Sequence, residues 1–154
     1  MKTILIATDG SPSAHEAVAF GLELAAEQSA EAVVVHVVPG VDVVPMSGFG
    51  MLGAQPHQPS AYDQVALDES LTLAAELGVS ARTELLSGNP VDEIVAYADS
   101  IDADLIVVGS RGHGAIASAF LGSVSQGVLH EARRPVLIFR PARAIVDTPA
   151  AAAR

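Results

Sequence analysis

The sequence predicts an α/β fold of three layers, in which helices cover both faces of a five-stranded parallel sheet. Short apolar runs alternate along the chain with longer segments of helical periodicity, and residues 105–108 are continuously apolar, as in a strand covered on both faces. Strands that alternate with helices pair in parallel through right-handed crossovers, which gives an α/β/α sandwich. The 154 residues suit one domain with a substantial core.

The order of the elements follows from these patterns and from capping residues. Strands are expected at residues 2–8, 31–38, 79–87, 105–108 and 136–139. Helices are expected from residue 12, over 60–77, from 90 to 101 and over 124–132. Ser11 and Asn89 are predicted N-caps because each precedes a proline, which is favoured at the first helical position, while Ser13 and Glu16 form a competing capping box. Residues 79–87 alternate apolar and polar side chains, as in an edge strand.

A glycine-rich loop separates the apolar strand at 105–108 from the helix that follows. Thirteen residues lie between Gly109 and Ser123, whereas such connections usually take roughly 2 to 6. Glycines let backbone N–H groups approach an anion. Ser123 is expected to cap the helix, so that its hydroxyl and the N–H groups of Val124 and Ser125 point toward a phosphate. The alternative is a flexible glycine loop without a ligand.

The spacing Gly109-x2-Gly112-x9-Gly122-Ser123 resembles the ATP-binding signature of the universal stress protein family, G-x2-G-x9-G-(S/T). The resemblance covers residues 1–140, from the opening ILIATDGS to the closing RPVLIF, and leaves 141–154 as a flexible C-terminal tail. It implies an adenine nucleotide alpha hydrolase-like sheet with strand order 3-2-1-4-5. Strands 1 and 4 then flank the switch point, where open α/β sheets bind ligands.

The resemblance also implies a site for an adenine nucleotide, ATP with Mg²⁺ bridging its phosphates. The residues that it assigns to the nucleotide are Ala7, Thr8, Asp9, Val37, Val108, Gly109, Arg111, Gly112, His113, Gly122, Ser123, Val124 and Ser125. Among them, the residues of the first strand line the adenosine, and the backbone of Val37 meets the adenine edge. For Asp9, a purely local turn with the N–H of Ser11 is the alternative role.

Composition excludes several other functions. Eight basic and eighteen acidic residues give a net charge of −10, which disfavours nucleic acid and anionic membranes as partners. Lys2 is the only lysine and the Walker A signature is absent, so no lysine can grip a phosphate from a loop. The absence of cysteine fits a cytoplasmic location, and no apolar stretch is long enough for a signal or a membrane span.

Two further features, His36 and residues 39–59, lie outside the residues assigned to the nucleotide. His36 stands in an apolar strand and is expected to be buried and hydrogen-bonded, and the five histidines are too scattered to predict a metal site. Residues 39–59 contain a Gly48-x-Gly50-x-x-Gly53 match to the dinucleotide fingerprint. We reject that match because the fingerprint must turn a strand directly into a helix. The segment is instead expected to be a lid or an interaction loop.

The sequence therefore favours an ATP-binding regulatory or stress-response module with an unknown protein partner. The alternatives are an interaction scaffold that does not use the pocket and a slow ATPase. We assign no catalytic residue, because the loop offers only Arg111 and His113 and neither is positioned by a recognisable pattern. The last strand, 136–139, is expected to form a homodimer by pairing with its two-fold mate, unless the tail folds back over this edge.

Overall fold

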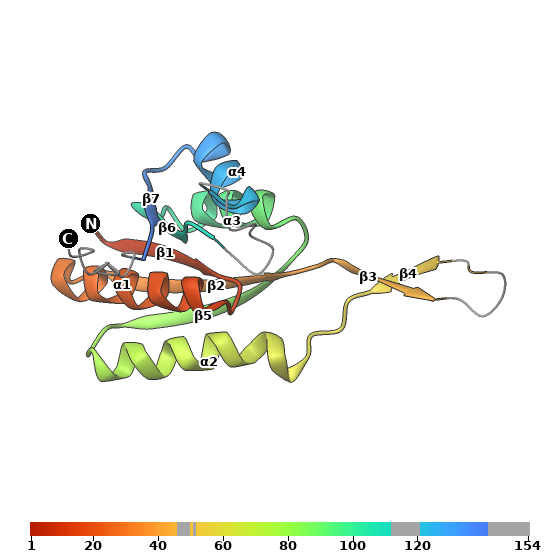
Figure 1. The fold of residues 1–154 in the computed structure, drawn as a ribbon. Coiled ribbons are helices and arrows are strands. Elements are labelled where there is room, and N and C mark those ends of the chain that lie inside the picture. The colour runs from red at the N-terminus through yellow and green to blue at the C-terminus, as the bar shows by residue number, and fades with distance from the viewer. Residues whose placement is uncertain (46–49, 51, 112–120, 142–154) are drawn as a thin grey trace, which may run out of the picture.

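The computed structural model describes residues 1–45, 50, 52–111 and 121–141. The predicted sandwich is confirmed: a parallel sheet with helices on both faces (Figure 1). The strands are β1 (Thr3–Thr8), β2 (Glu31–Val38), β3 (Val41–Pro45), β4 (Leu52–Pro56), β5 (Ala81–Ser87), β6 (Leu105–Gly109) and β7 (Val136–Phe139). The helices are α1 (Pro12–Gln28), α2 (Ala61–Glu76), α3 (Pro90–Ser100) and α4 (Ser123–Glu131).

The main sheet has five strands in the order β5-β2-β1-β6-β7, all parallel. By position along the chain this is the predicted order 3-2-1-4-5. β1 lies at the centre, where Ile6 pairs with Val34 of β2 on one side and with Val107 of β6 on the other. The chain builds one half of the sheet from β1 to β5 and the other from β6 to β7, so the switch point lies between β1 and β6. The predicted edge position of β5 is also confirmed.

Alternating side chains of the central strands divide the core into two layers. Ile4 and Ile6 are fully buried in a cluster with α1 and α2, whereas Leu5 between them is buried in a cluster with α3 and α4. Close packing of α1 on the sheet explains a glycine inside that helix, since a Cβ at Gly21 would lie 2.7 Å from Ile6 Cδ1. The two helical layers thus hold the carboxyl ends of the strands in fixed positions.

The segment predicted as a lid or loop contains a β-hairpin, β3–β4, which projects from the body of the protein beyond the end of β2 (Figure 1). Its antiparallel register places alternate residues of the two strands, all of them apolar, on the same face of the hairpin. That face is apolar and exposed, and consists of Val41, Val43, Pro45, Leu52, Ala54 and Pro56. Gly53 lies inside β4 rather than in a strand-to-helix turn, so the rejection of the dinucleotide fingerprint is confirmed.

The predicted tail, 141–154, lies outside the described residues except for Pro141. Within the described part of the chain, no helix combines the length and the apolar character that a membrane span requires.

Candidate functional site

A cavity of about 670 Å³ lies at the carboxyl ends of β1, β2 and β6, next to the first turns of α2 and α4. Every predicted site residue that the structure describes lines it. These residues are Ala7, Thr8, Asp9, Val37, Val108, Gly109, Arg111, Gly122, Ser123, Val124 and Ser125. Gly112 and His113 lie outside the described residues. The cavity has the size of a small-molecule site.

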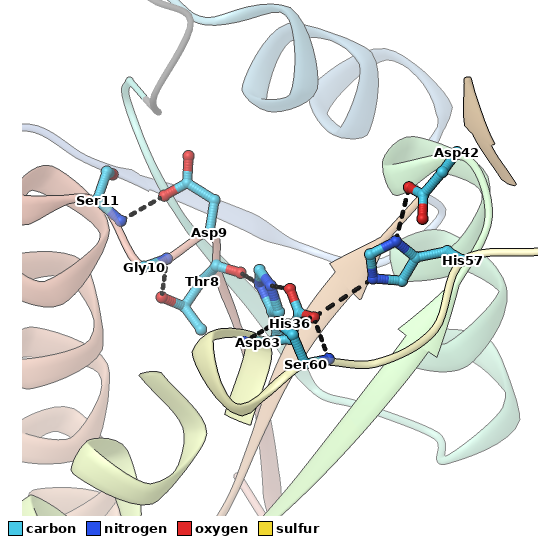
Figure 2. A network of polar contacts seen from close by, with 9 residues as sticks. All are labelled: Thr8, Asp9, Gly10, Ser11, His36, Asp42, His57, Ser60 and Asp63. Carbon is cyan, nitrogen blue, oxygen red and sulfur yellow. Dashed lines mark hydrogen bonds and ion pairs between the residues drawn. The ribbon is translucent and has the colours of Figure 1, made fainter. Parts of the chain in front are cut away.

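At the end of β1 the backbone turns sharply into α1. Gly10 has a φ of 76°, and its N–H donates to Thr8 Oγ1 at 3.2 Å. The N–H of Ser11 donates to Asp9 Oδ1 at 3.0 Å (Figure 2). Ser11 caps α1 by accepting from the N–H of Ala14. Asp9 therefore makes the local turn that was its alternative role, and it lines the cavity as well.

The start of α4 differs from the prediction. Gly122, not Ser123, is the N-cap, and no side chain caps this helix. Gly122 takes this position because its N–H donates to Ser110 O at 2.8 Å while its carbonyl accepts from the N–H of Gln126 at 3.0 Å. Ser123 is thus the first helical residue, and the prediction that it caps α4 was wrong. The N–H groups of the first turn of α4 have no hydrogen-bond partner within the helix, and the residues of this turn line the cavity.

The hydroxyl of Ser125 makes a hydrogen bond within the protein. It donates to the carbonyl of Gly109 at 2.6 Å, and so joins the end of β6 to the first turn of α4. The backbone at this joint is closely packed, since a Cβ at Gly109 would lie 3.3 Å from Arg111 O. A Cβ at Gly122 would have ordinary contacts, the nearest at 3.6 Å. The joint holds the α4 N-terminus beside Gly109 and Arg111.

A polar network on the opposite wall was not predicted as part of a site (Figure 2). His36 of β2 is buried, and its Nδ1 lies 2.9 Å from Thr8 O, which confirms the predicted buried and hydrogen-bonded histidine. His36 also lines the cavity, as do Tyr62 and Asp63 at the start of α2. Asp63 Oδ1 lies 3.8 Å from His36 Nε2.

Asp63 is held by the capping box of α2. Its Oδ2 accepts from the N–H of Ser60 at 2.7 Å and from Ser60 Oγ at 2.8 Å, and it lies 3.3 Å from Nε2 of His57. The hydrogen bonds from Ser60 are the main cause that lowers the pKa of Asp63 to about 2. His57 Nδ1 in turn lies 2.8 Å from Asp42 Oδ1 at the base of the hairpin. The hydrogen bond to Asp42 is the largest of the effects that raise the pKa of His57, and Asp63 adds to it.

The residues in the described ranges include no cluster of three or more His, Cys, Asp or Glu side chains suited to a metal ion. One wall offers backbone N–H groups at a helix N-terminus together with Arg111, and the opposite wall offers carboxylate and imidazole groups.

The fold and the position of this cavity define a doubly wound α/β protein with a ligand cavity at its topological switch point. The universal stress protein family model matches residues 1–140. The universal stress protein MJ0531 of Methanocaldococcus jannaschii is 37% identical over 142 residues, which cover 90% of this chain and 82% of that protein. The chain therefore belongs to the universal stress protein family.

Solved structures of the family agree with the architecture. A universal stress protein in complex with cAMP is similar with a TM-score of 0.70 and 28% identity, over 90% of this chain and 96% of that one. The universal stress protein from Archaeoglobus fulgidus in complex with dAMP is similar with a TM-score of 0.65 and 26% identity, over 90% and 97% of the two chains. Both of these related proteins bind adenine nucleotides.

Proposed function

We propose that the chain binds ATP, with Mg²⁺ bridging the phosphates, and acts as a cytoplasmic regulatory or stress-response module. The observation that carries this proposal is the cavity at the switch point, which brings the N-terminus of α4 together with the predicted residues at the ends of β1 and β6. The cAMP and dAMP complexes of related proteins support an adenine nucleotide as the ligand.

The phosphates are proposed to bind at the β6–α4 side. There the N–H groups of Ser123, Val124 and Ser125 and the positive end of the helix dipole favour an anion. Arg111 lines the same side and adds a positive charge. In place of a lysine, this arrangement offers backbone donors, which Gly122 leaves accessible because it has no Cβ.

The magnesium ion in this proposal is bound by phosphate oxygens and water. Mg²⁺ commonly keeps several waters and takes few protein ligands when phosphates are present. That behaviour suits a cavity whose described residues hold no cluster of metal-ligating side chains.

The proposal makes the protein a binding module and not an efficient ATPase. Hydrolysis needs an oriented water and a group that stabilises the transferring phosphoryl. Among the described residues of the β6–α4 side, Arg111 is the one cationic side chain that lines the cavity. The described residues of that side contribute no carboxylate or imidazole group to the cavity lining.

The test is direct measurement of nucleotide binding. Mass spectrometry of nucleotide released from natively purified protein, followed by calorimetry with ATP and Mg²⁺, is expected to show one adenine nucleotide per chain. Protein that is folded but empty, and that gives no heat with ATP, would support the scaffold alternative and overturn the proposal.

We also propose a homodimer through β7. This strand is an edge of the sheet, and its residues Val136–Phe139 are apolar and partly exposed. An apolar edge with unpaired backbone groups favours pairing with another strand, and a two-fold mate satisfies both edges at once.

A further inference from the structure

His57 lies at the root of the β3–β4 hairpin, where the chain passes from β4 toward α2. Its N–H donates to the carbonyl of Gly40 at 3.2 Å, which closes the hairpin just before β3 begins. Residues 39–40 and 57–60 have no regular secondary structure and connect the hairpin to β2 and α2. Because the hairpin projects away from the sheet and helices (Figure 1), its orientation on the body of the protein depends on the contacts at this root.

The ring of His57 lies between two carboxylates from different parts of the chain. Its Nδ1 lies 2.8 Å from Asp42 Oδ1 of β3, and its Nε2 lies 3.3 Å from Asp63 Oδ2 of α2 (Figure 2). The ring is largely buried, with 15% of the His57 side chain exposed. Asp42 and His57 are both fixed to the hairpin, so the contact of His57 with Asp63 joins the hairpin to the body.

These two contacts require a proton on both ring nitrogens. An ionised carboxylate only accepts hydrogen bonds, and a neutral imidazole has one N–H and one acceptor nitrogen. Asp63 is ionised, since the hydrogen bonds from Ser60 are the main cause that lowers its pKa to about 2. The imidazolium donates to both carboxylates at once, whereas the neutral ring turns a lone pair toward one of them.

The charged groups that contact the ring in the described part of the chain are Asp42 on β3 and Asp63 on α2. The hydrogen bond to Asp42 is the largest of the effects that raise the pKa of His57, and burial acts in the opposite direction. On β2 the next titratable group is His36, whose Nε2 lies 3.8 Å from Asp63 Oδ1. The bridge therefore persists to a higher pH than a histidine with the ordinary pKa of 6.5 would allow.

Loss of one ring proton weakens the joint to the body and not the hairpin itself. The contact of His57 with Asp63 is longer than that with Asp42. Asp63 Oδ2 also accepts from the N–H of Ser60 at 2.7 Å and from its Oγ at 2.8 Å, so it stays hydrogen-bonded without His57. Nδ1 therefore keeps the remaining proton, and the lone pair of Nε2 faces the Asp63 carboxylate and is repelled by it.

We propose that His57 is a pH-sensitive latch, which holds the β3–β4 hairpin against the start of α2 as an imidazolium and releases it when Nε2 loses its proton. The released hairpin moves about its two connections to β2 and α2. Its apolar face, where Val43 and Leu52 are 69% and 71% exposed, is then no longer presented in one direction. The latch goes beyond the proposed nucleotide site and does not depend on it.

The test is NMR of the full chain, isotopically labelled and without nucleotide, from about pH 5.5 to about pH 9, the range in which a histidine with a raised pKa titrates. The ring signals of His57 give its pKa, and the backbone order parameters of β3 and β4, compared with those of α2, give the mobility of the hairpin. Below the pKa of His57 the hairpin values should lie near the ~0.85 of rigid backbone, and above it they should fall toward ~0.6.

Variants separate the latch from other effects of pH. His57→Gln has no ring proton to lose, so its hairpin mobility should not change with pH. Asp42→Asn removes the charge opposite Nδ1, so the hairpin should loosen at a lower pH, together with the titration of the ring. His15→Gln is the matched control, since it removes an exposed histidine 3.8 Å from Glu69 of α2 and should leave the transition unchanged.

The outcomes decide for or against the latch. Hairpin order parameters that stay constant while His57 titrates in the folded wild type overturn it, as does a transition that follows the ring signals of His36 or survives in His57→Gln. If His57→Gln does not fold, Asp42→Asn decides: a ring pKa that shifts without the mobility overturns the latch, and a joint shift supports it. Since no nucleotide is added, failure of the proposed ATP binding leaves this result unaffected.

Discussion

Gly122→Ala tests the phosphate end of the site with a single methyl group. The added Cβ would lie 3.6 Å from Arg111 Cα, 3.6 Å from Ser110 O and 3.7 Å from Ser125 Oγ, which are ordinary contacts. The φ of Gly122, −71°, is accessible to alanine. The substitution therefore leaves the fold intact. It fills the space, here called the notch, that Ser110, Arg111 and Ser125 surround.

The expected loss of stability and the expected loss of ATP affinity differ enough to be told apart. Alanine is a poorer N-cap than glycine, which costs roughly 0.5 to 1 kcal/mol of the free energy of unfolding, a small part of the ~5 to 15 kcal/mol typical of a domain. Loss of one charge-assisted hydrogen bond from α4 to a phosphate costs about 1.5 to 3 kcal/mol. This loss corresponds to a roughly ten- to hundredfold weaker affinity for ATP.

The assay is calorimetric titration with ATP and Mg²⁺, paired with thermal unfolding. Gly40→Ala is a matched control, since its Cβ would lie 3.8 Å from the nearest atom and Gly40 does not line the cavity. It should bind ATP like the wild type. If folded Gly122→Ala binds ATP within about twofold of the wild type, less than the loss of one such bond predicts, the phosphates do not approach this notch.

Four further predictions follow from the same contacts. The pKa of Asp63 is lowered from 3.8 to about 2, so its stabilising effect is full above about pH 4 and is lost as the pH falls toward 2; thermal unfolding should show a fall in Tm across this window that is smaller in Asp63→Asn. The pKa of His57 is raised above 6.5, mainly by the hydrogen bond to Asp42, so its contribution is full below about pH 6.5 and is lost as the pH rises through the raised value; NMR titration should show a lower pKa for His57 in Asp42→Asn. Ile138→Asp places a charge on the β7 edge and should convert a dimer to a monomer in sedimentation, and a wild type that is already monomeric at micromolar concentration would contradict the dimer. Turnover of ATP should stay below ~1 s⁻¹, the lower end of ordinary enzyme rates, and a higher rate would contradict the binding-module proposal.

The helices and strands of the fold could be predicted because their signals are local in the sequence, whereas the strand order and the residues assigned to the nucleotide came from the family resemblance. The N-caps Ser11 and Asn89 each precede a proline, and the structure confirms both. The apolar run at 105–108 became β6, and the residues that the resemblance assigned to the nucleotide line the cavity wherever the structure describes them. The cap of α4 was assigned one residue too late, because serine is a better N-cap in general but the hydrogen bond from Gly122 to Ser110 decides the turn here.

The opposite wall could not be predicted because it depends on distant segments. Ser60 and Asp63 form a recognisable capping box, S-x-x-D, but nothing in the sequence places it beside the end of β2. The hairpin was missed for a local reason. Its strands contain prolines at positions 45 and 56, which usually argue against a strand and are tolerated here because the hairpin has two edges.

The charge distribution is compatible with the proposed binding of a polyanion by an acidic chain. A net charge of −10 opposes an anionic ligand at long range, but at physiological ionic strength salt largely screens repulsion between exposed charges that are more than about 8 Å apart. Inside the cavity the nearby groups decide, and they differ along it: Arg111 and the α4 N-terminus lie on the β6–α4 side, Asp9 lies at the end of the central strand β1, and Asp63 lies on the β2–α2 side. A phosphate is therefore favoured at only one end of the cavity. Because Asp63 is ionised at neutral pH, a nucleotide bound in the reverse orientation would place phosphate against its carboxylate, and the repulsion opposes that orientation.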